Sequence, residues 1–132
     1  MKFNKETDYA IRMVLLCAKN MPKLLSTTEI VNICKIPPNL GKAILTKLTN
    51  NNILESVKGK NGGIRYIQSK NTVSLYDIIK IFEKIEINSC IENKNSCLYK
   101  FGDCSVCEKL KELKLIFEKE LKNTYIESLI QE

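Results

Sequence analysis

The order of its apolar patterns constrains this chain most, because three helical patterns are followed by two strand-like segments around a glycine-rich tip. Apolar residues at helical spacing predict a first helix over Lys5–Lys19. Ser26 and Glu29 form a capping-box pattern that opens a short second helix ending near Cys34. A third helix is predicted over Pro38–Asn50, where three consecutive asparagines end it.

The segment after these helices predicts a β-hairpin with a basic tip. Residues 53–57 and 64–68 have the composition of short strands, and residues 58–63 between them contain an Asn-Gly turn signal. Three helices followed by a hairpin is the order of a winged helix-turn-helix, with residues 38–50 as the recognition helix. We therefore expect a mainly α fold with a small β-hairpin.

The second half predicts a helix after Ser74, an irregular cysteine-rich loop, and one long helix from Ser105 to the C-terminus. We expect three parts: a winged helix-turn-helix domain over 1–86, a loop over 87–104 and a dimerisation helix over 105–132. The last helix carries an apolar stripe too long for one small core to cover, so we expect it to pack against a second copy. The stripe consists of Val106, Leu110, Leu113, Phe117 and Leu121.

The two halves of the chain differ in charge. Residues 1–72 contain twelve Lys and Arg against four acidic residues, whereas residues 73–132 contain nine Lys against eleven acidic residues. A genomic preference for lysine would be spread evenly along the chain. The asymmetry therefore indicates that the first half binds a polyanion and the second half a protein or a cofactor.

Composition also excludes several classes of protein. The 132 residues contain no histidine, which excludes Ser-His-Asp and Cys-His catalysis as well as histidine-ligated zinc. No run approaches the roughly 18 apolar residues of a membrane span, and the first residues lack the apolar segment of a secretory signal. We expect a cytoplasmic protein that is not an enzyme.

The polar positions of the third predicted helix and the basic tip are the candidate DNA-binding residues. Asparagine and lysine can bond base edges, and lysine and threonine also suit phosphates. A solvated helix face would show the same pattern, but the neighbouring basic glycine-rich tip favours double-stranded DNA as the partner. With neighbouring positions of the second helix and the tip, the candidates are Thr28, Asn39, Lys42, Ala43, Thr46, Lys47, Lys58, Lys60, Asn61, Gly62 and Arg65.

Six cysteines fall into two groups. Cys17 and Cys34 lie on apolar helical stripes, which favours small core residues. The other four lie within 18 residues and are Cys90, Cys97, Cys104 and Cys107. Their spacing permits an iron–sulfur cluster, which tolerates loose spacing, a zinc site with a single Cys-x-x-Cys pair, or a thiol switch. The spacing favours the cluster over zinc.

Three segments resemble the IscR/NsrR-type winged-helix iron–sulfur transcription regulators over the whole chain. They are the opening Asp8-Tyr9-Ala10-Ile11, the run from Ile44-Leu45 through Val57-Lys58-Gly59 to Gly62-Gly63, and the cysteine loop ahead of a long last helix. The resemblance implies a homodimeric DNA-binding regulator, of the repressor kind, whose cluster senses iron–sulfur status, redox state or nitric oxide. It also implies binding to a pseudo-palindromic operator.

The resemblance carries cluster ligation onto Cys90, Cys97 and Cys104. The fourth ligand is either Cys107, which stands where IscR has a histidine, or Asp8 of the partner protomer, as in other members. The DNA-reading positions also differ from the family, because Lys58 stands where an arginine is usual, and Lys42 and Ala43 replace acidic and amide side chains. Alternatives are a zinc-stabilised or thiol-switch DNA-binding regulator and an electron-transfer protein.

Overall fold

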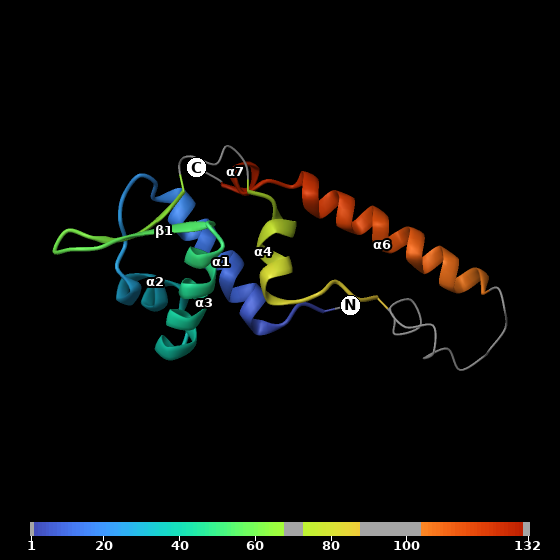
Figure 1. The fold of residues 1–132 in the computed structure, drawn as a ribbon, viewed down its shortest axis with the longest axis horizontal. Helices are drawn as coiled ribbons and strands as arrows, with labels where there is room; N and C mark the ends of the chain where they lie inside the picture. The colour runs from blue at the N-terminus through green and yellow to red at the C-terminus, as the bar shows by residue number, and fades with distance from the viewer. Residues whose placement is uncertain (1, 68–72, 88–103, 131–132) are drawn as a thin grey trace.

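The computed structural model describes residues 2–67, 73–87 and 104–130, and the four helices before residue 88 pack with the hairpin into one body (Figure 1). In this body α1, α2 and α3 come first, the hairpin β1–β2 follows, and α4 closes it. The elements are α1 Lys5–Lys19, α2 Thr27–Cys34, α3 Pro38–Asn50, β1 Leu54–Val57, β2 Gly63–Tyr66, α4 Leu75–Phe82, α6 Ser105–Asn123 and α7 Ile126–Leu129. The predicted bounds of the first and third helices are confirmed.

The capping signals in the sequence fix where the helices begin. The Ser26 hydroxyl accepts a hydrogen bond from the backbone N–H of Glu29, whose carboxylate accepts one from the Ser26 N–H in return. Ser74 and Asp77 make the same reciprocal pair at the start of α4. Each pair satisfies two backbone donors that a helix N-terminus otherwise leaves without partners.

Helices α2 and α3 pack closely because Gly41 has no side chain. A Cβ atom at this position would lie 2.4 Å from Val31 Cγ1 and 3.3 Å from Met13 Cε. The glycine therefore allows α3 to approach both α2 and α1, which fixes the helix-turn-helix geometry.

The end of α3 determines where the hairpin begins. Asn52 adopts the left-handed conformation with φ 60°. The N–H of Asn52 donates to the Thr49 carbonyl, and the N–H of Ile53 donates to the Leu48 carbonyl. This is a Schellman motif. It uses Ile53 in the helix cap, so β1 begins at Leu54 and not at residue 53 as the sequence predicted.

The hairpin is antiparallel, with Leu54 opposite Tyr66 and Val57 opposite Gly63. Leu25 adds a third backbone segment, since it exchanges two hydrogen bonds with Ile64. The second strand ends at Tyr66, before its predicted end at residue 68, which lies outside the described residues. The extra pairing with Leu25 attaches the base of the hairpin to the helical body.

The prediction of one long helix to the C-terminus is wrong. Helix α6 ends at Asn123, beside the body (Figure 1), and the chain continues there as the separate short helix α7. The Leu75 N–H donates to the Thr124 carbonyl, and the Ile126 N–H donates to the Val73 carbonyl. These bonds bring the fully buried Ile126 into the core. Burial of this one side chain and the paired backbone favour the turn over continued helix.

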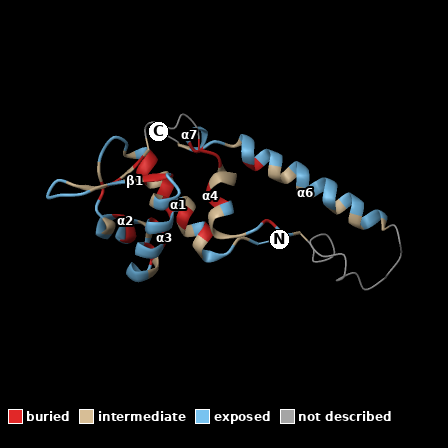
Figure 2. Cartoon of the chain, in the orientation of Figure 1, coloured by how far each residue is buried: buried red, intermediate tan, exposed pale blue. Residues whose placement is uncertain are grey.

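Burial differs sharply between the body and α6 (Figure 2). The largest core side chains of the body are fully buried: Met13, Ile30, Ile44, Leu48 and Ile78 are at most 1% exposed. Helix α6 extends away from the body and, over its described residues, buries only Leu121. No helix in the described ranges is both long and apolar enough to cross a bilayer.

Candidate nucleic-acid interface

Helix α3 has one buried side and one polar side. Ile44, Leu45 and Leu48 pack into the core, whereas Asn39, Lys42, Ala43 and Thr46 are exposed. Pro38 at the first helical position suits a helix start. The exposed side chains, together with the exposed Thr28 near the start of α2, lie where the sequence predicted a DNA-reading surface.

A shallow groove of about 250 Å³ lies between this polar side and the hairpin. It is lined by residues of α2, α3 and both strands, namely Thr27, Lys42, Leu45, Thr46, Thr49, Asn50, Ser56 and Ile64. The structure therefore places the hairpin beside the recognition helix. Ser56 of β1 and Ile64 of β2, which lie on opposite sides of the hairpin turn in the sequence, line the same groove as the residues of α3.

The hairpin tip projects from the body and carries exposed Lys58, Lys60 and Asn61 (Figure 1). Two glycines make its tight path possible. Gly59 has φ +113°, and a Cβ atom at Gly62 would lie 2.0 Å from the Val57 carbonyl oxygen. A side chain at Gly62 would therefore displace the backbone that presents the two lysines.

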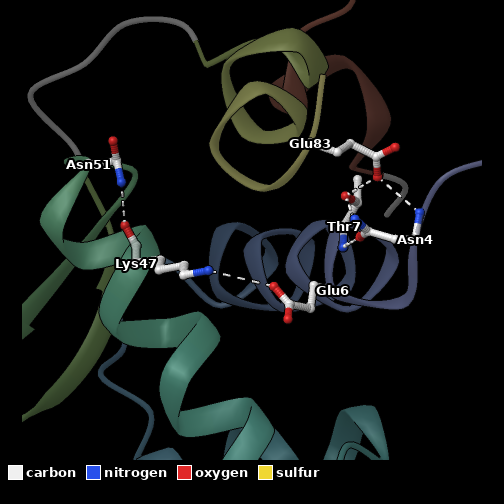
Figure 3. Close-up of polar contacts among 6 residues, drawn as sticks. All are labelled: Asn4, Glu6, Thr7, Lys47, Asn51 and Glu83. Carbon is white, nitrogen blue, oxygen red and sulfur yellow. Dashed lines mark hydrogen bonds and ion pairs between the residues drawn. The ribbon is translucent and has the colours of Figure 1, made fainter. Parts of the chain in front are cut away.

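Two predicted DNA-binding cations are engaged within the chain. Arg65 Nε lies 2.9 Å from Glu55 Oε2, its neighbour across the hairpin. Lys47 Nζ lies 3.7 Å from Glu6 Oε2 in α1 (Figure 3) and 5.6 Å from the centre of the Phe82 ring. Lys42 thus lines the groove and Lys58 and Lys60 lie exposed on the hairpin tip, whereas Lys47 is directed toward α1 and α4.

The exposed side chains of α3 and of the hairpin tip have the chemistry to bind a nucleic-acid duplex. An α-helix fits the major groove, where Asn39 and Lys42 can bond base edges and Thr46 can reach phosphates. The lysines of the tip add positive charge that a phosphate backbone attracts without sequence preference. The surface combines an exposed polar helix face with a positively charged hairpin tip.

Cys104 and Cys107 lie at the start of α6, Cys104 as its N-cap residue and Cys107 in its first turn. Both are free thiols and partly buried. Residues three apart share one face of a helix, so the two thiols lie on the same side of its first turn. Cys90 and Cys97 lie outside the described residues, and no group of three metal-binding side chains occurs among those described.

The other two cysteines belong to the body. Cys17 is fully buried, and burial raises the pKa of its thiol to about 12, with the neighbouring Cys34 adding to the rise. Burial also raises the pKa of the partly buried Cys34, although Arg12 opposes the change. Cys17 is thus a core residue, as expected, and Cys34 packs against the core from a partly exposed position. Asp8, the alternative ligand, is exposed and lies 2.8 Å from Arg12 in an ion pair.

The predicted dimerisation stripe divides along α6. Leu121 packs with Ile79 and Ile85 of its own chain, and Phe117 stacks on Phe3 at 6.4 Å between ring centres. Val106 and Leu113, nearer the start of the helix, are 64% and 43% exposed. The structure therefore places the C-terminal part of the stripe, Phe117 and Leu121, against its own chain. The N-terminal part, with Val106 and Leu113, stays accessible.

Sequence reasoning missed two exposed apolar residues and one polar network. Leu115 and Ile116 are 67% and 50% exposed, and they lay outside the heptad stripe used for the prediction. Glu83 bonds to the first turn of α1, a contact over more than seventy residues that no local pattern reveals. Leu115 and Ile116 could have been found by counting every apolar residue of the predicted helix, and not only those of the stripe.

Comparisons with known proteins agree with this geometry. The model of the Rrf2 family, described as "Iron-dependent Transcriptional regulator", matches residues 3–132. A putative HTH-type transcriptional regulator of Aquifex aeolicus is 29% identical over 98% of this chain and 92% of its own length. Protein aau3 of Rhizobium meliloti is 35% identical over 83 residues, which span 63% of this chain and 54% of that protein.

Solved structures share the fold. CymR of B. subtilis, the global cysteine regulator, superposes with a TM-score of 0.77 and 16% identity over 98% of this chain and 96% of its own. T. potens IscR superposes with a TM-score of 0.74 and 16% identity over 98% and 85%. The solved structures confirm the predicted winged-helix fold. The family match and the Aquifex aeolicus relative confirm the predicted class, a DNA-binding transcriptional regulator and not an enzyme. The chain belongs to the Rrf2 family of transcriptional regulators.

Proposed function

We propose that this regulator is a cytoplasmic homodimer whose operator binding is controlled by an iron–sulfur cluster. The ligands are Cys90, Cys97, Cys104 and Cys107, with Asp8 of the partner protomer as the alternative fourth ligand. The observation that carries the proposal is the pair of free thiols at the start of α6. Thiolates are the usual ligands of such clusters, so this donor set fits.

The two thiols lie one turn apart and partly exposed, so both can bind the same group. They also stand at the boundary between the predicted parts 87–104 and 105–132. When bound, an iron–sulfur cluster supplies a redox-active and labile centre. The chain itself supplies the ligands, the helix that holds two of them, and the surface that binds DNA.

The DNA-binding mode follows from the surface described above. Helix α3 enters the major groove with Asn39, Lys42, Ala43 and Thr46, while Lys58, Lys60, Asn61 and Gly62 of the tip approach the phosphates or the minor groove. Two such surfaces in a dimer bind two half-sites of a pseudo-palindromic operator. Exposed Val106 and Leu113, with Leu110, supply the dimer contact along α6.

Control requires contact between α6 and the DNA-binding body. Leu121 packs against Ile79 of α4, and Ile126 is buried in the core of the body. The C-terminal segment also contacts the hairpin, because the Tyr66 hydroxyl donates a hydrogen bond of 2.8 Å to Glu127 Oε1. A change at the start of α6 can therefore reach the DNA-binding body through two sets of contacts. One is the packing of Leu121 on α4, and the other is the bond between Glu127 and Tyr66 of the hairpin.

The visible absorption spectrum and metal content of protein purified without oxygen test this proposal. We expect iron and sulfide, and we expect Ser replacement of Cys90, Cys97 or Cys104 to remove the colour while Cys17→Ser retains it. Colour that persists in Cys107→Ser assigns the fourth position to Asp8 of the partner protomer. Zinc alone, or no metal with retained regulation, would establish the zinc or thiol-switch alternative instead.

A DNA-binding assay separates the remaining alternative. An electron-transfer protein has no need of a basic hairpin tip, so it would show a cluster but no salt-sensitive binding to duplex DNA. We expect the purified dimer to bind duplexes in a salt-dependent manner.

A further inference from the structure

The first turn of α1 bonds to the segment that follows α4 (Figure 3). Glu83 Oε2 accepts a hydrogen bond of 2.9 Å from the Asn4 backbone N–H and another from the Thr7 hydroxyl. Asn4 Oδ1 accepts a hydrogen bond of 2.8 Å from the Thr7 N–H. Thr7 is fully buried. The Glu83 carboxylate therefore sits at the positive end of α1, where the helix dipole stabilises it.

The same turn of α1 also contacts the recognition helix. Glu6 pairs with Lys47 of α3, and the Lys47 ammonium lies over the ring of Phe82, the last residue of α4. The Asn51 amide donates a hydrogen bond of 2.8 Å to the Lys47 carbonyl at the end of α3. Lys47 thus links α3 to α1 through Glu6 (Figure 3) and to α4 through Phe82.

We infer that Lys47 and Glu83 are positioning residues that set the placement of α3 for DNA binding, with the first turn of α1 between them. Lys47 acts through Glu6 and Phe82 and does not contact a phosphate. Glu83 acts through Asn4 and Thr7. Glu83 and Phe82, the ring under the Lys47 ammonium, lie where α4 leads into residues 84–87, which precede the cysteine-rich segment in the sequence. We call the contacts of Lys47 and Glu83 at the end of α4 the junction. The second part of the inference, that the junction connects the cysteine-rich segment to α3, rests on the proposed function.

The energies of the contacts explain why they act on position. The Lys47 and Glu6 side chains are 54% and 42% exposed, and exposed ion pairs add little to folding stability. The bond from the buried Thr7 hydroxyl to Glu83 is stronger because its acceptor is charged, and Asn4 Oδ1, at 2.9 Å, is the second acceptor within reach of this hydroxyl. Glu83 therefore anchors the junction, and Lys47 aligns α3 on it.

A double-mutant cycle on operator affinity tests the first part. The probe is a duplex selected by the wild-type protein from a randomised library. We expect Lys47→Gln and Glu83→Gln each to weaken binding about threefold to tenfold, and the double variant to be no more than about twofold weaker than the weaker single variant. Lys47→Arg keeps the positive charge, so it should bind with the affinity of the wild type, unlike Lys47→Gln. The exposed Glu86→Gln is the matched control and should change affinity less than about twofold.

The salt dependence of binding gives a second readout. If the Lys47 ammonium bound a phosphate, Lys47→Gln would lower the slope of log affinity against log salt by about 0.9, whereas a positioning role leaves the slope unchanged. Strictly additive losses together with a lower slope would overturn the inference. If Glu83→Gln lowers the melting temperature severely, Thr7→Val and Thr7→Ser replace it in the cycle. Thr7→Ser keeps the hydroxyl and should retain affinity, and equal losses in both variants would also overturn the inference.

The cycle needs no cluster, so its result stands apart from the proposed function. If the protein carries no iron, the proposed function fails while the cycle still decides the roles of Lys47 and Glu83. If the protein carries a cluster, Glu83→Gln should bring the ratio of loaded to iron-free operator affinity toward one. An unchanged ratio, with the cycle positive, would overturn only the link to the cysteine-rich segment.

Discussion

The helical body and α6 solve the burial of apolar side chains in different ways. The body buries its core within one chain, so that Met13 and Leu48 have no exposed surface. Helix α6 leaves Val106, Leu115 and Ile116 at least half exposed, and it contacts the body mainly near its C-terminal end (Figure 1). The body is specified by its own contacts, whereas the described residues leave much of the apolar surface of α6 uncovered.

Thiol reactivity should distinguish the two regions most strongly. A thiol with a pKa of about 12 has roughly a thousandfold less thiolate at pH 8 than an ordinary cysteine, and only the thiolate reacts with iodoacetamide. In reduced, iron-free protein we expect Cys104 and Cys107 to be alkylated rapidly and Cys17 to remain unmodified. Mass spectrometry of timed samples measures this, and unfolding in denaturant should make all sites reactive. Equal rates for Cys17 and Cys107 in native protein would contradict the contrast.

The second prediction concerns the exposed face of α6. Leu113→Lys combined with Ile116→Lys should convert the dimer to monomer and weaken binding to a two-half-site operator about a hundredfold, because the second half-site is no longer bound through a linked protomer. These positions are preferable to Phe117, which stacks on Phe3 of its own chain. Sedimentation velocity and operator titration provide the measurements.

Glu108→Lys is the control for that pair, since Glu108 is exposed near the start of the same helix and its replacement removes no apolar group. This variant should remain dimeric. A double variant that stays dimeric at micromolar concentration would show that the dimer contact lies elsewhere.

The third prediction compares the effect on stability of one truncation in the core of the body with one on the exposed apolar stripe of α6. Leu48→Ala should lower the free energy of unfolding by about 2–5 kcal/mol at every protein concentration, because it leaves a cavity in the body. Leu113→Ala should lower the melting temperature mainly at low protein concentration, where the dimer dissociates. Thermal melts across a hundredfold range of concentration, each compared with the wild type, test this. A Leu113→Ala effect independent of concentration would mean that Leu113 is buried within its own chain.

The smallest effects concern individual DNA-binding side chains of the body. Lys58→Ala should weaken binding to all duplexes by roughly 1 kcal/mol and lower the salt slope by about 0.9, because one phosphate is no longer neutralised. Lys42→Ala should change the preference among sequences by about 1–3 kcal/mol, since its side chain lies on the base-reading side of α3. Anisotropy titrations at several salt concentrations measure both.

Lys119→Ala, on the exposed part of α6, controls for the removal of one positive charge. It should bind as the wild type does. Wild-type affinity and salt slope in Lys58→Ala would remove the hairpin tip from the DNA interface.

Local signals explain which parts of the fold could be predicted from the sequence. Ser26, Ser74 and the two asparagines that follow α3, Asn51 and Asn52, act through hydrogen bonds to nearby residues, so these helix bounds followed from residue types. The break at Thr124 could not be predicted, because it depends on backbone pairing with Val73 and Leu75, some fifty residues earlier. The apolar period of the last helix continues through the break and gives no sign of it.

The candidate site shows the same division between local and distant causes. The exposed side of α3 and the basic tip were predicted because both depend on local periodicity and turn residues. The engagement of Lys47 was not predicted, because Glu6 and Phe82 approach it from other elements. A lysine on the polar face of a helix has the same sequence signature whether it contacts DNA or another part of its own chain.

Operator affinity measured on one anaerobic preparation before and after removal of iron tests the central claim most directly. The claim is that the cysteine segment ahead of α6 controls DNA binding by the body. The account predicts that loss of the visible absorption changes affinity for the selected operator at least about tenfold, equivalent to about 1.4 kcal/mol. The same affinity within twofold, in protein that no longer holds its cluster and remains dimeric, would contradict it.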